Sequence, residues 1–146
     1  MKKKNSSDEY VLPDYQSNLN IVGRGKGIAS YYKNEYKHAR NINSDGISIT
    51  KLESDKLDMV AIYRSQEGNV TTLIEHLESL ITKGKTTLVG GDFNICAFAH
   101  PRNYITASLR EIEFNQLVET SIHIEEGMID HAYIKQRENS KYSYKV

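Results

Sequence analysis

The sequence contains the stretch Thr87-Leu88-Val89-Gly90-Gly91-Asp92-Phe93-Asn94-Ile95, which says more about the fold than any other segment. A short β-branched and aliphatic run ends in two glycines, and an aspartate and an asparagine follow, two residues apart. Side chains of extended backbone alternate between faces, so we expect Asp92 and Asn94 to point the same way and Phe93 to face the opposite side. A carboxylate and a carboxamide at the end of a buried strand suit the task of holding and activating a water beside a phosphate.

The same segment has a second interpretation. Gly-Gly-Asp is also common turn chemistry, in which an Asp or Asn side chain caps the residues that follow. The two glycines let either a ligand or another backbone approach closely. Both interpretations stay open at the level of the sequence.

The composition sets outer limits on the protein. A chain of 146 residues suits one domain, and its 19 basic residues balance its 19 acidic ones, so no global charge marks a nucleic-acid binder. No apolar run approaches the length of a membrane-spanning helix, and no secretory signal follows the lysines at the N-terminus. The single cysteine, Cys96, excludes an internal disulfide framework. We therefore expect an intracellular protein, cytoplasmic or nuclear, with no membrane partner.

Hydrophobic periodicity and turn residues predict an α/β protein with helices packed on a sheet. Asn69 is a plausible helix N-cap and Gly84 a plausible residue after the helix end, because apolar residues recur between them at spacings of three and four. We expect a second helix at 106–120 and a polar segment at 34–45. The expected strands are 28–33, 47–52, 56–63, 86–89 and 129–134, with another beginning at 141–146.

Gly23-Arg24-Gly25-Lys26-Gly27 invites comparison with a phosphate-binding loop. The Gly-x-x-x-x-Gly-Lys-Ser/Thr spacing is absent, and a strand is expected where such a loop needs a helix. A tight hairpin is the better interpretation, and its Arg24 and Lys26 could contact a polyanion.

Two further pairs of neighbouring residues are candidates for the site. Tyr63 and Arg64 close an expected strand at the edge where Asp92 emerges, and together they could clamp a phosphate. The alternative is a strand-end tyrosine beside a solvated arginine.

Asp130 and His131 look like a catalytic pair, but neighbouring residues of a strand face opposite ways, so both cannot serve one site. The five histidines and Cys96 show no zinc-type spacing, and we assign no residue as a metal ligand.

Taken in order, the Gly-Arg-Gly-Lys-Gly hairpin, the Tyr-Arg strand end, Gly-Gly-Asp-Phe-Asn and the Ile-Asp-His strand resemble the endonuclease/exonuclease/phosphatase superfamily. The similarity covers roughly residues 11–146 and looks closest to the endonuclease domains of non-LTR retrotransposon-like proteins. It implies a partial two-sheet α/β sandwich over residues 10–146, with residues 1–9 as a disordered N-terminal tail.

The resemblance also implies an activity, a metal-dependent phosphodiesterase and most naturally a DNA endonuclease using Mg²⁺ or Mn²⁺. Asp92 would orient and activate the attacking water, Asn94 would hold the scissile phosphate, and Tyr63 would contact it. Arg64 and Asp130 would complete the substrate-binding residues. In chemical terms this is displacement at phosphorus with fixed donors stabilising the developing charge.

The sequence departs from the family at both ends. The family's N-terminal Asn and Glu motifs and its C-terminal Asp-His motif have no counterpart in this sequence, which implies impaired catalysis. One alternative is a non-catalytic remnant, or a nucleic-acid- or protein-binding module of the same fold. A further hypothesis is that a second chain completes the sheet, because unpaired strands and apolar surface favour such pairing.

Overall fold

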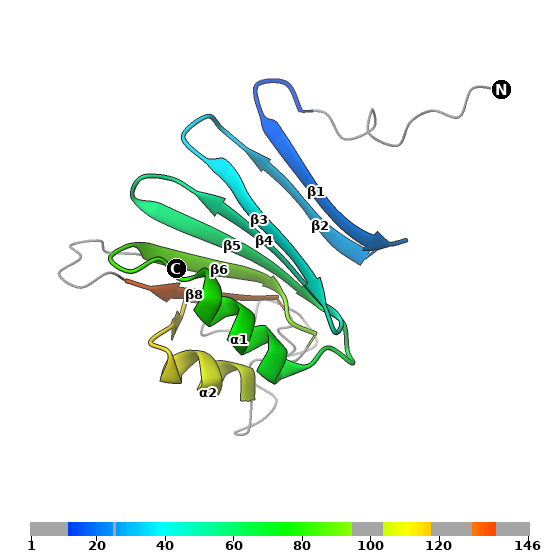
Figure 1. Ribbon diagram of the computed structural model, residues 1–146, viewed down its shortest axis with the longest axis vertical. Coiled ribbons are helices and arrows are strands. Elements are labelled where there is room, and N and C mark those ends of the chain that lie inside the picture. Colours follow the sequence, from blue (N-terminus) through cyan, green and yellow to red (C-terminus); the bar gives the residue numbers. More distant parts are fainter. Residues whose placement is uncertain (1–11, 25, 95–103, 118–129, 137–146) are drawn as a thin grey trace, which may run out of the picture.

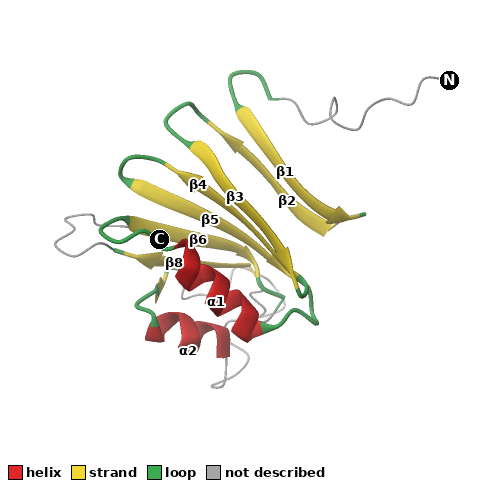
Figure 2. Cartoon of the chain, viewed as in Figure 1, coloured by secondary structure: helices red, strands yellow, loops and turns green. Residues whose placement is uncertain are grey.

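The computed structural model describes residues 12–24, 26–94, 104–117 and 130–136, which form two β-sheets and two helices (Figure 1). The small sheet is two-stranded, and the large one has six strands in the order β3-β4-β5-β6-β8-β7. Figure 2 shows both helices beside the large sheet. The predicted α/β class and two-sheet arrangement are therefore confirmed. The N-terminal tail, Cys96 and the strand expected at 141–146 lie outside the described residues.

The small sheet is a hairpin of β1 (Gln16–Gly23) and β2 (Lys26–Tyr32), paired antiparallel. Its turn contains the glycine-rich segment, so the hairpin interpretation of that segment is confirmed. The register shifts between Ile21 and Gly23, which places a bulge at the end of β1. Bulges re-aim side chains and often lie beside functional sites.

Strand β3 (Lys37–Ser44) lies in the segment that the sequence marks only as polar, where no strand is expected. β3 is the edge strand of the large sheet, and Ile42 is its one buried residue. Because its other side chains are mostly polar or charged, the strand lacks the alternation of apolar and polar residues by which a sequence predicts a strand. The turn that follows is the expected one. Asp45 and Gly46 have φ of 48° and 76°, as in the two-residue turns that suit a β-hairpin.

The centre of the molecule is built from β4 (Ile47–Glu53), β5 (Leu57–Arg64), α1 (Val70–Leu80) and β6 (Thr86–Asp92). β5 and β6 are parallel, and α1 crosses between them. Asn69 caps α1 as predicted, since its side chain accepts a hydrogen bond from the Thr72 backbone nitrogen. Gly84 does not follow the helix end directly. The helix ends at Leu80 with Ile81 as its C-cap, and Gly84 (φ 80°) lies in a separate turn closed by the bond from Lys85 N to Thr82 O.

The second helix is shorter than predicted. α2 spans Tyr104–Glu111, and Asn115–Gln116 form the short strand β7 inside the range that we expected to be helical. Glu113 adopts φ 70°, with bonds from Glu113 N to Arg110 O and from Phe114 N to Leu109 O. This is a Schellman ending with a glutamate at the position where glycine is usual, so the sequence carried no glycine to mark it.

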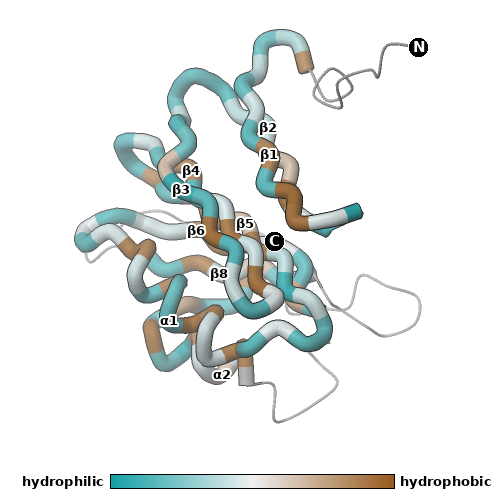
Figure 3. The backbone as a smooth tube through the Cα atoms, turned by 45° about the vertical axis from the view of Figure 1, so that its right-hand side comes forward, coloured by the Kyte–Doolittle hydropathy of each residue, from teal (hydrophilic) through white to brown (hydrophobic). Residues whose placement is uncertain are grey.

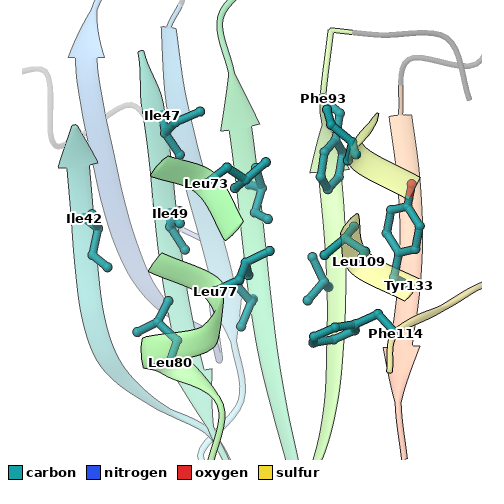
Figure 4. Packing of buried hydrophobic residues seen from close by; sticks show 14 residues of the cluster. Ile42, Ile47, Ile49, Leu73, Leu77, Leu80, Phe93, Leu109, Phe114 and Tyr133 are labelled. Carbon is teal, nitrogen blue, oxygen red and sulfur yellow. The ribbon is translucent and has the colours of Figure 1, made fainter. Parts of the chain in front are cut away.

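Strand β8 (Asp130–Lys135) pairs with β6 and β7 and confirms the strand expected at 129–134. The two helices cover one face of the large sheet, and Figure 4 shows their apolar side chains packed on β4, β6 and β8. The hairpin β1–β2 contacts β3, β4 and β5 on the opposite face, as Figure 3 also shows. No described helix is long and apolar enough to span a membrane.

A buried ion network ties β4, β5 and the end of α1 together. The Lys51 Nζ donates to Leu80 O at 2.6 Å and to Thr82 Oγ1 at 3.1 Å, and lies 3.4 Å from Asp58 Oδ2. The fully buried Asp58 carboxylate also forms an ion pair with Lys85 Nζ. Lys51 thus neutralises a buried charge and satisfies a carbonyl at a helix end, where backbone groups lack partners within the helix.

Candidate functional site

Three of the predicted site residues lie in one row across the large sheet. Tyr63 at the end of β5 is the register partner of Asp92 at the end of β6, and Asp92 is the register partner of Asp130 at the start of β8. Register partners on neighbouring strands share a face of the sheet and lie close together. For Asp130 only this backbone position is described.

The glycines before Asp92 lie where the backbone of another strand comes close to β6. Gly91 has φ 144°, and a Cβ atom there would overlap the Ile62 carbonyl oxygen of β5. A Cβ atom at Gly90 would meet His131 O at an ordinary 3.6 Å. Close contact between β5 and β6 therefore requires glycine at Gly91, which brings Asp92 level with Tyr63.

The backbone turns immediately after Asp92. Asn94 has φ 51°, and its backbone nitrogen donates to Asp92 Oδ1 at 2.9 Å. The turn interpretation is thus confirmed, and the strict alternation expected through Asn94 stops at the end of β6. Phe93 does face away from the row, fully buried among the core residues. The bond uses one oxygen of the Asp92 carboxylate and leaves the other for a water.

Arg64 fastens this turn to the loop after β5. Its Nη1 donates to Phe93 O at 2.9 Å and its Nε to Gly68 O at 2.9 Å, while Asn94 Nδ2 donates to Arg64 O at 2.8 Å. Burial lowers the pKa of the Arg64 guanidinium from its ordinary value. These bonds give Arg64 a structural task that the sequence did not reveal, and its contact with substrate stays a prediction. The Asn94 amide keeps a second N–H for a ligand.

Aromatic side chains support the turn from the helix-covered side. Phe93 stacks on His131 with ring centroids 4.8 Å apart, and the rings of Phe93 and Tyr133 form a T-shaped pair with centroids 5.7 Å apart. The Tyr133 hydroxyl lies 2.7 Å from His131 Nδ1 and 2.9 Å from Thr106 Oγ1. Burial raises the pKa of Tyr133 to about 12. His131 and Tyr133 share a face as predicted, and the structure gives His131 this packing role.

The row continues beyond Tyr63 through residues that the sequence did not single out. Ser48 on β4 is the register partner of Tyr63, and Asn43 on β3 is the partner of Ser48. Asn43 was missed because its strand has almost no apolar period. The row therefore carries an amide, a hydroxyl, a phenol and a carboxylate in sequence across the sheet.

The described residues do not form a complete metal centre. Among them no three His, Cys, Asp or Glu side chains come together to hold an ion. Asp92 offers one carboxylate oxygen, and divalent ions such as Mg²⁺ take several oxygen ligands. This donor set therefore fits a divalent ion only in part.

An apolar groove runs along the sheet face opposite the helices. One part, of about 700 Å³, includes Leu57, Leu88, Leu117 and Ile134 in its lining. A second part, of about 440 Å³, shares Leu88 and Leu117 and reaches Ala61, Gly90 and Ala132. These last three residues lie two positions from Tyr63, Asp92 and Asp130, so the groove leads toward the row.

Comparison with solved structures identifies similar folds. The endonuclease domain of TRAS1, a telomere-specific non-LTR retrotransposon, superposes with a TM-score of 0.61 at 12% identity, over 88% of this chain. A mannosyl-6-phosphatase of Bacteroides thetaiotaomicron gives 0.58 at 15% identity over 85% of this chain. An endonuclease/exonuclease/phosphatase family protein of the same bacterium gives 0.59 at 16% identity over 85%. No protein-family model and no curated protein matches the sequence.

This chain matches only part of the length of each solved structure. This chain spans 67%, 64% and 60% of those three chains, respectively. Identities this low establish the fold and leave activity, substrate and partners to be argued from the site.

Proposed function

We propose that this chain, which has the endonuclease/exonuclease/phosphatase fold, is a nuclease-like phosphodiesterase domain, most naturally a DNA endonuclease of impaired activity. The observation that carries the proposal is the row of Tyr63, Asp92 and Asp130, with Asn94 in the turn directly after it. A carboxylate, an amide and a phenol at one edge of a sheet form a set of groups suited to hydrolysis of a phosphate ester.

Each residue has a task in this proposal. The Asp92 oxygen not bonded to Asn94 accepts a proton from the attacking water and aims its lone pair at phosphorus. The second amide N–H of Asn94 and the Tyr63 hydroxyl donate to the non-bridging phosphate oxygens, where charge builds up. Arg64 and the Phe93–His131 stack hold the turn in place. Asp130 completes the substrate-binding row.

A divalent ion, Mg²⁺ or Mn²⁺, is the cofactor that we propose. When bound, such an ion neutralises charge on the phosphate. The free Asp92 oxygen is assigned to the attacking water, so no described side chain is assigned as a ligand of the ion.

A plasmid-nicking assay tests the activity. Purified protein is incubated with supercoiled plasmid and Mg²⁺, Mn²⁺ or a chelator, and nicked product is measured over time. We expect slow, metal-dependent nicking that Asp92→Asn lowers by about two orders of magnitude, since it removes the base. Asparagine can still accept the bond from Asn94 N, so this variant separates lost chemistry from a lost turn.

The control is the thermal melt of each protein. Asp92→Asn should melt close to the parent, whereas Asp92→Ala removes the turn bond as well and should cost about 1 kcal/mol. Undiminished nicking by a folded Asp92→Asn variant would overturn the assignment of Asp92. Complete absence of nicking by a protein that melts cooperatively would favour the second candidate function.

That second candidate is a binding module of the same fold, and the apolar groove favours it. The groove opens beside β2, which pairs only with β1 among the described strands. An extended segment of a second chain could add to that edge and place alternate apolar side chains over Leu88 and Leu57. This arrangement would complete the small sheet and could also supply site residues.

A further inference from the structure

Among the described residues, the β1–β2 hairpin contributes nothing to the apolar core between the large sheet and the helices. The buried members of that core lie on the large sheet, on α1 and α2, and in the turns after β6 and α2. Of the residues described in β1 and β2, Tyr32 is the only buried hydrophobic one. Figure 1 shows the hairpin apart from both helices. Because a two-stranded hairpin is at best marginally stable by itself, its folded state depends on its contact with the large sheet.

Polar groups hold the hairpin on the large sheet. Asn20 on β1 is 3% exposed, and its Nδ2 donates to Ile49 O of β4 at 3.1 Å. Asn43 Nδ2 of β3 donates to Asn20 Oδ1 at 2.7 Å. Ser48 and Thr50 also face the hairpin, because Ile49 between them packs in the core on the helix side. Water can replace hydrogen bonds of this kind, so separating these two layers costs less free energy than separating two apolar surfaces would.

Asn18, two residues before Asn20 on the same face of β1, lacks such bonds at its side-chain oxygen. This Oδ1 atom is buried and has no hydrogen-bond partner among the described residues. A buried acceptor without a partner has lost its hydration, which destabilises the closed arrangement. Water would reach the atom if the hairpin moved away from the sheet. Opening therefore relieves an unfavourable contribution to the closed state.

A short connection joins the hairpin to the large sheet. β2 ends at Tyr32 and β3 begins at Lys37, and the bond from Tyr36 N to Lys33 O, 3.0 Å long, closes the turn between them. The turn is exposed apart from Tyr36, which is half-buried. Hinges are a few loop or element-terminal residues that absorb large changes in φ and ψ, and this turn has such a position.

We propose that the β1–β2 hairpin is a gate, which separates from the large sheet as a unit while that sheet and the helices stay folded. Val22 and Lys26 of the hairpin form one wall of a cleft of about 330 Å³, and Ser48 and Tyr63 of the row lie on its other side. Opening removes the first wall and exposes these two members of the row to solvent. Such an opening needs less free energy than global unfolding. The proposal concerns a motion of the chain and does not depend on the proposed hydrolysis.

Thiol labelling tests the gate. Ser48→Cys is placed in a Cys96→Ser background, and its reaction with a bulky aromatic disulfide is followed at increasing urea concentration. Ser48 is 2% exposed and faces the hairpin, whereas Val89→Cys, at a fully buried position on the helix side, is the matched control. We expect Ser48→Cys to react about a hundredfold faster, with a weak dependence on urea. The rate at Val89→Cys should rise steeply with urea, because only global unfolding exposes it.

A second pair of variants tests whether the polar contacts control the opening. Asn20→Ala removes the bonds to Ile49 O and Asn43, so the reaction at Ser48→Cys should become about tenfold faster. Asn18→Ala, on the same face of the same strand, removes an oxygen without a partner and is the control. It should not accelerate the reaction.

Amide hydrogen exchange of the unsubstituted chain gives an independent measurement and decides alone if a cysteine variant fails to fold. Amides of β1 and β2 should exchange with a lower opening free energy than those of β5 and β6. Exchange of all four strands only through global unfolding would overturn the gate. Equal rates and equal urea dependence at Ser48→Cys and Val89→Cys would overturn it too, as would equal effects of Asn20→Ala and Asn18→Ala.

Discussion

The residue that most tightly constrains the candidate site is Gly91. Its backbone conformation and its contact with Ile62 O leave no room for a side chain, whereas Gly90 beside it has ordinary space. The sequence predicted close approach at this pair of glycines without distinguishing ligand from backbone, because φ and the position of β5 are tertiary properties. The sequence likewise could not show that the Arg64 guanidinium donates to backbone carbonyls, because the Phe93 carbonyl that accepts one of these bonds is distant along the chain.

Alanine substitutions at the two glycines should therefore differ sharply. Gly91→Ala forces Cβ into β5 and strains the backbone, so we expect a loss of about 3 kcal/mol or more in the free energy of unfolding. Gly90→Ala should change it by less than about 1 kcal/mol. Urea denaturation followed by circular dichroism measures both. Equal effects of the two substitutions would contradict the close approach of β5 to β6.

At the scale of elements, the sequence predicted those with a clear apolar period and a marked end. β4, β5, α1 with its Asn69 cap, β6 and β8 belong to this group. β3 was missed because an edge strand with one buried residue has almost no apolar period. The end of α2 was missed because Glu113 occupies the left-handed position where a glycine would have given the signal.

The ion network at the end of α1 gives a prediction for an element. Lys51→Met leaves Leu80 O without its donor and removes one of the two ammonium groups beside the fully buried Asp58. Breaking a buried pair by removing one partner costs about 3–5 kcal/mol, and we expect a loss in that range in the free energy of unfolding. Lys83→Met, at an exposed lysine in the following turn, is the control. An effect no larger than that of the control would show that the network contributes no stability.

Among the described residues, one face of the large sheet is well covered and the other is partly open. Helices bury the first, while β1 and β2 cover β3, β4 and β5 on the second and leave the groove over β6 and β8. The sequence indicated two layers through the family resemblance and the apolar residues on both parities of β5. It could not show which strands the small sheet covers, because that depends on how the layers meet in space.

The open face should bind apolar compounds and favour self-association. We expect the parent to bind anilinonaphthalene sulfonate and to associate at high concentration, and Leu88→Lys to weaken both about tenfold by placing a charge in the groove. Ile21→Lys, on an exposed apolar residue outside the groove, is the control for dye binding. Dye titration and sedimentation velocity measure the effects. A parent that stays monomeric and binds no dye would show that the groove is covered.

The connectivity of the large sheet sets the order in which it can assemble on the ribosome. β3, β4, β5 and β6 are consecutive along the chain, so they can pair as soon as residue 92 has emerged. β8 pairs with β6 but begins at Asp130, after α2 and β7, so this pairing closes a long loop and is expected to come late. Until then the edge of β6 that ends in Asp92 is open to solvent and to other nascent chains. This late pairing is also the step that brings Asp130 beside Asp92.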